Sequence, residues 1–67
     1  MNKKIYDMLK KSAEADLAKA DLSLDLLGYN AVGIGDHSTG DFYKNAEEAL
    51  SMAADALDRL ETLKRYE

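Results

Sequence analysis

Residues 42–63 read FYKNAEEALSMAADALDRLETL, and the spacing of their apolar residues decides the fold. Apolar residues recur at alternating intervals of four and three, at Phe42, Ala46, Ala49, Ala53, Ala56, Leu60 and Leu63. We call these seven residues the alanine seam, because four of them are alanine. A seven-residue repeat predicts a helix that packs one face along another helix, and small seam residues allow the partner to come close. Leu50 and Leu57 widen this face on one side.

The small size of the chain limits how it can be stabilised. A domain of 67 residues buries only about 60% of the surface of its unfolded chain, so small domains usually need a disulfide, a metal or a partner. The sequence has no cysteine and one histidine, so a disulfide and a histidine-rich metal site within one chain are excluded. We therefore expect the chain to associate with itself.

The first segment predicts a second helix, over about residues 3–27. Asn2 is a suitable N-cap, and Gly28 is expected to end the helix in a left-handed conformation. The apolar side of this helix is wider than one partner helix can cover. The fold class expected is all-α: a two-helix antiparallel hairpin that dimerises into a four-helix bundle.

Three polar residues, Asp16, Lys19 and Ser23, interrupt that apolar side. One interpretation is an ion pair between Asp16 and Lys19, three residues apart, at the edge of the interface. The other is a polar group that sets the register between subunits, or a small site at the subunit interface.

The chain is expected to form one domain over residues 1–67, with a loop at 28–38 and a second helix at about 39–66. Ser38 and Asp41 match a capping box at the start of that helix. Within it, Asp55 with Arg59 and Glu61 with Arg65 have the spacing of helical ion pairs.

The glycine-rich loop is either a structured cap or a ligand-binding loop. Gly35 and Gly40 have the spacing of a phosphate-binding loop, but Asp41 stands where that motif has lysine, which disfavours nucleotide hydrolysis. Tyr29 and Tyr43 either cap the loop end of the bundle, as Tyr6 and Tyr66 cap the other end, or stack on a planar ligand. The ligand candidates are Gly33, Gly35, Asp36, His37, Ser38, Tyr29 and Tyr43.

No set of residues in the sequence predicts catalysis. His37 lies between Asp36 and Ser38, but a serine one residue away along a loop cannot normally reach the base, so a structural histidine is favoured. A metal held by His37, Asp36 and Asp41 from several subunits remains an alternative, whereas the Glu-x-x-His motif of ferritin-like iron sites is absent. We expect a protein that is not an enzyme, with no cofactor and no metal.

The charge pattern bears on partners and orientation. The formal net charge of −4 disfavours nucleic-acid binding, and no apolar run is long enough to span a membrane. The first residues lack the apolar core of a secretory signal, so we expect a cytoplasmic protein. Basic residues gather near both termini and acidic ones near the loop, which predicts an end-for-end dimer with Asp16, Lys19 and Ser23 of the two chains close together.

Two segments, AVGIGDHSTGD at 31–41 and DRLETL at 58–63, resemble small uncharacterised helical proteins of marine tailed phages. The resemblance implies a viral accessory protein, and it transfers no catalytic residue. A host protein is a candidate partner. The function expected is that of a small, non-enzymatic, self-associating interaction protein. The alternative is a protein that binds or sequesters a small ligand with residues 33–41, near a subunit interface.

Overall fold

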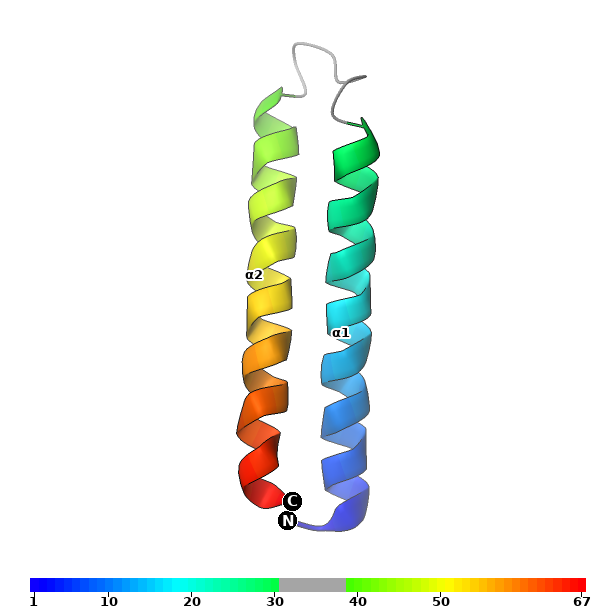
Figure 1. The fold of residues 1–67 in the computed structure, drawn as a ribbon, viewed down its shortest axis with the longest axis vertical. Helices are drawn as coiled ribbons and strands as arrows, with labels where there is room; N and C mark the ends of the chain where they lie inside the picture. The colour runs from blue at the N-terminus through cyan, green and yellow to red at the C-terminus, as the bar shows by residue number, and fades with distance from the viewer. Residues whose placement is uncertain (31–38) are drawn as a thin grey trace.

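The computed structural model describes residues 1–30 and 39–67 as two long helices side by side. Helix α1 spans Lys3–Asn30 and α2 spans Thr39–Leu63, followed by a short 3-10 turn, η3, at Lys64–Tyr66. The helices run in opposite directions, and both termini lie at the end of the hairpin away from residues 31–38 (Figure 1). The predicted all-α hairpin is therefore confirmed.

Helix α1 begins where the sequence predicts and ends later. The Asn2 Oδ1 atom accepts hydrogen bonds from the backbone N–H groups of Lys4 at 2.7 Å and Ile5 at 3.4 Å, which is the expected N-cap. Gly28, however, does not end the helix, and no described glycine has a positive φ. Glycine permits the left-handed conformation but does not require it, and no proline follows to stop the helix. The loop predicted at 28–38 thus begins too early, and Tyr29 lies on α1.

The ends of α2 agree with the expected range of about 39–66. The α-helix begins at Thr39, has Asp41 in its first turn and passes into η3 after Leu63. Lys64 and Arg65 lie in that last turn, where positive charge is favourable beside the carbonyl end of the helix. Ser38, and with it the predicted capping box, lies outside the described residues.

The contact between the helices is built mainly from alanine. Three side chains of the alanine seam are buried alanines, Leu63 is buried beside them, and Phe42, Ala46 and Leu60 are half-buried. On α1 they face Ala13 and Ala20, both 0% exposed. Among the described residues no side chain larger than alanine is fully enclosed. Small residues let the backbones approach closely, but they bury little apolar surface.

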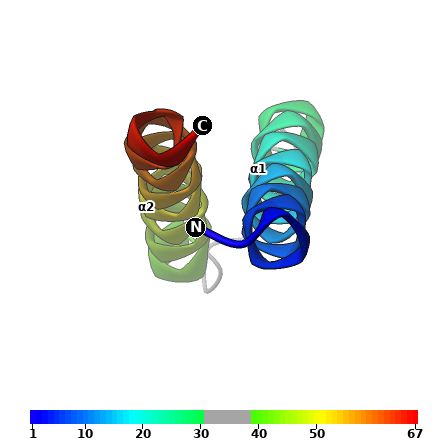
Figure 2. The same ribbon diagram turned by 90° about the horizontal axis from the view of Figure 1, so that it is seen from below.

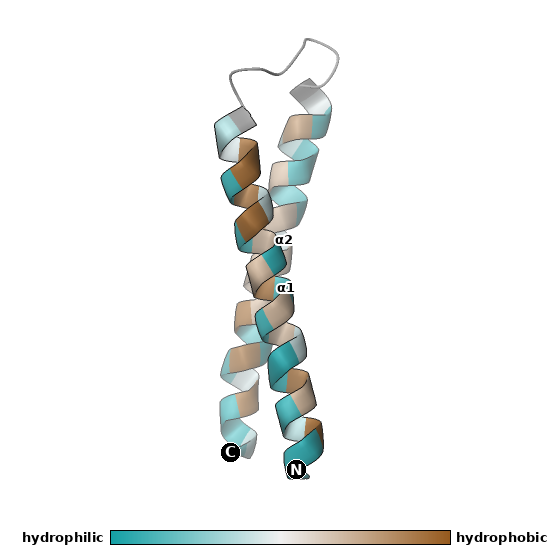
Figure 3. Ribbon diagram, turned by 90° about the vertical axis from the view of Figure 1, so that its right-hand side faces the viewer, coloured by the Kyte–Doolittle hydropathy of each residue, from teal (hydrophilic) through white to brown (hydrophobic). Residues whose placement is uncertain are grey.

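The hairpin is elongated, with extents of 50 × 13 × 12 Å. The helices lie side by side and cross at a shallow angle when viewed from the end and from the side (Figures 2 and 3). The accessible surface is 5278 Å², against about 4,200 Å² for a compact monomer of this mass. Of the roughly 10,700 Å² that the unfolded chain would expose, folding removes only about half. A single hairpin therefore leaves more of its surface exposed to solvent than a compact monomer of the same mass.

Candidate interaction surfaces

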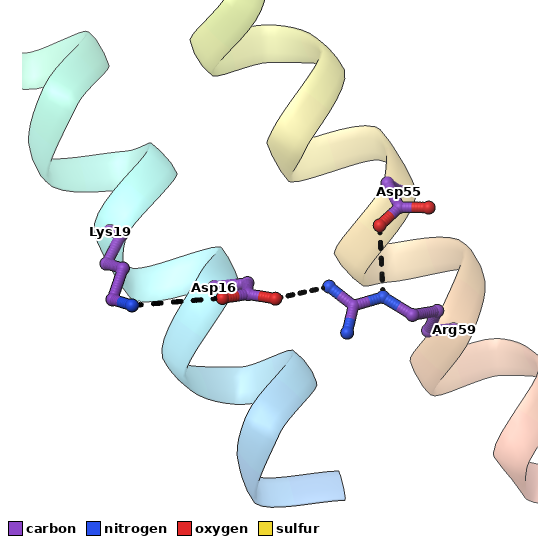
Figure 4. A network of polar contacts seen from close by, with 4 residues as sticks. All are labelled: Asp16, Lys19, Asp55 and Arg59. Atoms are coloured by element: carbon purple, nitrogen blue, oxygen red, sulfur yellow. Dashed lines mark hydrogen bonds and ion pairs between the residues drawn. The ribbon is translucent and has the colours of Figure 1, made fainter. Parts of the chain in front are cut away.

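One polar network links the middle of α1 to the C-terminal part of α2 (Figure 4). The Arg59 guanidinium on α2 donates through Nη2 to Asp16 Oδ2 on α1 at 2.6 Å and through Nε to Asp55 Oδ2 at 3.0 Å. Lys19 Nζ lies 4.0 Å from the second Asp16 oxygen. The Asp16 hydrogen bond raises the pKa of Arg59 further above its usual range, so Arg59 stays charged.

This network confirms two predicted ion pairs and adds one that the sequence analysis missed. Asp16 pairs with Lys19 and Asp55 with Arg59, as predicted, but the shorter bond joins Asp16 to Arg59 across the hairpin. Residues 43 positions apart can be paired only when the alignment of the helices is known. Both side chains remain partly in water, 34% and 39% exposed, so the network acts as a register clamp of modest strength.

The predicted pair of Glu61 with Arg65 is wrong. Among the described residues, the Glu61 carboxylate instead accepts a bond from Lys64 Nζ at 3.0 Å, and this bond raises the pKa of Lys64. Positions three and four apart on a helix are both within reach, and the turn into η3 brings Lys64 nearer.

Large apolar side chains left in solvent are the most prominent feature of the surface. More than a third of the surface of each of these residues is exposed: Met1, Ile5, Met8, Leu9, Leu22, Leu26, Tyr29, Tyr43, Leu50, Met52, Leu57 and Tyr66. On α1, apolar residues gather in the half nearest residues 31–38, and polar ones prevail toward the N-terminus (Figure 3). So many exposed apolar residues on a chain of this size are typical of an interaction surface.

The hairpin has two faces that differ in the side chains they carry. Helical residues advance by about 100°, which puts Leu17 and Leu24 at about 40–60° to one side of Ala20, and Asp16 on the other side. On α2 the same geometry separates Leu50 and Leu57 from Arg59. Because Asp16 and Arg59 bond each other, they share one face, and the four leucines share the opposite one. We call these the charged face and the leucine face.

Two shallow grooves lie on the charged face. One of about 370 Å³ lies near the loop end between the helices and is lined by Ser23, Leu26, Leu27, Asn45, Glu48, Ala49 and Met52. A second, of about 280 Å³, lies near the termini and is lined by Met1, Leu9, Arg59, Thr62, Leu63 and Tyr66. Both grooves expose more apolar than polar surface.

Most of the predicted ligand candidates lie outside the described residues: Gly33, Gly35, Asp36, His37 and Ser38. Tyr29 is 81% exposed and Tyr43 is 59% exposed, and the Tyr43 ring packs edge-to-face on Phe42 with centroids 5.7 Å apart. Within residues 1–30 and 39–67, no three His, Asp or Glu side chains are grouped to hold a metal ion. The alternative metal set of Asp36, His37 and Asp41 cannot be placed, because two of its members are not described.

The end of the hairpin that holds the termini is closed by the expected tyrosines. The Tyr6 hydroxyl donates to Glu67 Oε1 at 3.3 Å, and Tyr6 and Tyr66 line the same shallow hollow. Partial burial, together with the nearby Glu67 carboxylate, raises the pKa of Tyr6 above its ordinary value of 10.0. These contacts tie the last residue of the chain to α1.

Comparisons with known proteins return no match to any family model, curated protein or solved structure. Neither of the two described helices is long and apolar enough to cross a membrane.

Proposed function

We propose that this chain is a non-enzymatic interaction protein that works as a self-associated helical bundle. The observation that carries the proposal is the position of the apolar side chains. The buried contact consists of five alanines and Leu63, whereas leucines such as Leu22, Leu50 and Leu57 are more than half exposed. Large apolar side chains therefore lie mainly on the outer surface of the hairpin and not in the contact between its helices.

The energetic consequence favours association. Fully burying a leucine side chain contributes about 1.5–3 kcal/mol, and an alanine methyl group about 0.8 kcal/mol. A hairpin that encloses mainly alanines gains little from its own core. Association that covers the exposed leucines supplies a larger gain, against which the entropic cost of association must be set. In self-association the partner is a second copy of the chain, so it is present wherever the chain is, at the same concentration.

A second protein partner is part of the proposal. Apolar residues lie on both faces of the hairpin, so a homodimer that covers one face leaves the other available. The resemblance to phage proteins suggests a viral accessory protein, with a host protein as the partner. The charge of −4 favours a partner surface that carries basic residues around an apolar centre.

The test is the mass of the protein in solution. Sedimentation equilibrium and light scattering at micromolar concentration should give at least twice the 7.4 kDa mass of the chain. Circular dichroism on the same samples should show a largely helical chain. A helical, cooperatively melting species with the mass of one chain throughout that range would overturn the proposal.

A further inference from the structure

We propose that the leucine face is the surface on which a second copy of this chain docks, with the two hairpins end for end. The inference rests on the proposed self-association and specifies its surface and orientation. The occupant is a second copy because the surface is apolar at its centre and the charges of the two halves of the hairpin complement each other.

The four leucines form a continuous apolar patch. The bond between Asp16 and Arg59 brings these two positions within reach of an arginine side chain, and antiparallel helices advance in opposite senses, so Leu17 lies near Leu57 and Leu24 near Leu50. Each helix contributes two leucines one heptad apart, with Ala20 and Ala53 beneath them. Leu50 and Leu57 are 63% and 55% exposed, and Leu17 and Leu24 are half-buried. Asp21 lies along α1 between Leu17 and Leu24, but it is about 40–60° further round the helix, at the edge of the patch.

The charged face is less suited to self-docking. Its centre holds Asp16, Arg59, Asp55 and Lys19, and a second copy there would take these ionised groups out of water. The hydrogen bonds of Asp16 and Arg59 are already made within the chain, so the pair needs no partner subunit. The sequence-based expectation is that Asp16, Lys19 and Ser23 of two chains meet. We propose in its place that the two chains dock through the opposite face.

Two orientations would place leucine on leucine, and charge selects between them. The half of the hairpin nearest residues 31–38, residues 17–30 and 39–55, has six acidic and two basic residues, whereas the half with the termini has seven basic and six acidic residues. Docking with the Asn30 ends of both α1 helices together would put the two acidic halves together. The end-for-end arrangement puts each acidic half against the weakly basic half of the partner.

In the end-for-end arrangement each helix lies over its own copy. Leu17 meets the partner's Leu24, Leu57 meets the partner's Leu50, and the two-fold axis passes near Ala54. One heptad further along, Lys64 lies over the partner's Tyr43, an exposed ring that can bind its ammonium group. Asp21 comes near its own copy, but at the exposed edge, where salt screens the repulsion.

The first test compares two leucines that are equally exposed in the hairpin. Leu50 is 63% exposed on the leucine face, and Leu22 is 60% exposed on the outer side of α1, away from the leucine face. Leu50→Lys should weaken dimerisation by roughly a hundredfold in sedimentation equilibrium, and Leu22→Lys should leave it nearly unchanged. The reverse result would overturn this inference while self-association stands. A parent protein that is monomeric would overturn both.

Cross-linking tests the orientation in a protein whose fold is intact. The chain has no cysteine, so Ala54→Cys introduces a unique thiol near the two-fold axis. Mild oxidation should convert this variant to a disulfide-linked dimer, and Ala15→Cys, on the outer, charged-face side of α1, should remain reduced. In a dimer with the Asn30 ends of both α1 helices together, Ala54 lies over the partner's α1 and no Ala54→Cys dimer forms. Efficient Ala15→Cys cross-linking without Ala54→Cys cross-linking would place the interface on the charged face.

Discussion

Replacing Gly28 by alanine tests whether α1 ends at Gly28 or continues through it. The change in stability should have opposite signs in the two cases. If Gly28 ended α1 in a left-handed conformation, a Cβ atom there would be strained and the variant less stable. In the structure Gly28 lies within α1, without a positive φ, and a Cβ atom built on it meets nothing within 4 Å. We therefore expect Gly28→Ala to stabilise the protein.

The magnitude follows from the position of the residue. Glycine in a helix interior is less favourable than alanine by about 0.5–1 kcal/mol, because it loses more backbone freedom on folding. Gly28 lies two residues before the end of α1, where helices fray, so the lower part of that range applies. For a domain of this size, about 0.5 kcal/mol corresponds to a rise in melting temperature of roughly 2–4 °C.

The assay is thermal unfolding followed by circular dichroism at one protein concentration, because association makes the melting temperature depend on concentration. The exposed Ala18 of α1 supplies the control. Ala18→Gly should lower the melting temperature, by about 4–8 °C for a loss of 1 kcal/mol, which calibrates the effect of glycine in this helix. A lower melting temperature for Gly28→Ala would refute the reasoning and restore the helix end expected from the sequence.

Three further predictions concern packing, the polar clamp and pH. Ala53→Leu should overpack the helix contact and cost about 1–3 kcal/mol of unfolding free energy. Ala18→Leu, at an exposed position, should cost little. Equal melting temperatures for the two variants would mean that the buried face is misplaced. Arg59→Met should remove the bonds to Asp16 and Asp55 yet keep an apolar stem. It should therefore lower the melting temperature more at low salt than at high salt. A loss of stability that does not depend on salt would contradict an electrostatic role for these bonds. The raised pKa of Tyr6 means that the folded state holds this proton more tightly, so its stabilisation should be present below pH 10.0 and disappear as the pH rises through the raised value. Thermal melts from neutral to strongly alkaline pH should show this decline, and Tyr6→Phe should remove its contribution; an unchanged decline would contradict it.

The sequence alone determined the elements and the line along which they meet. The alternation of four and three from Phe42 to Leu63 is a local pattern typical of a helix packed along one face, and all seven of these residues are buried or half-buried. Asn2 was predicted as a cap because its side chain acts on N–H groups two and three residues away. Such features depend on near neighbours in the chain, which the sequence lists directly.

Tertiary structure decided what depends on the alignment of one helix against the other. The bond between Asp16 and Arg59 requires a particular register, and the grouping of Leu17, Leu24, Leu50 and Leu57 follows from that same register. The end of α1 was also decided in three dimensions, since the conformation of Gly28 depends on whether continuing the helix is more favourable than turning. The face that remains for a partner is therefore a property of two packed helices, because neither helix alone determines which of its exposed leucines lie together.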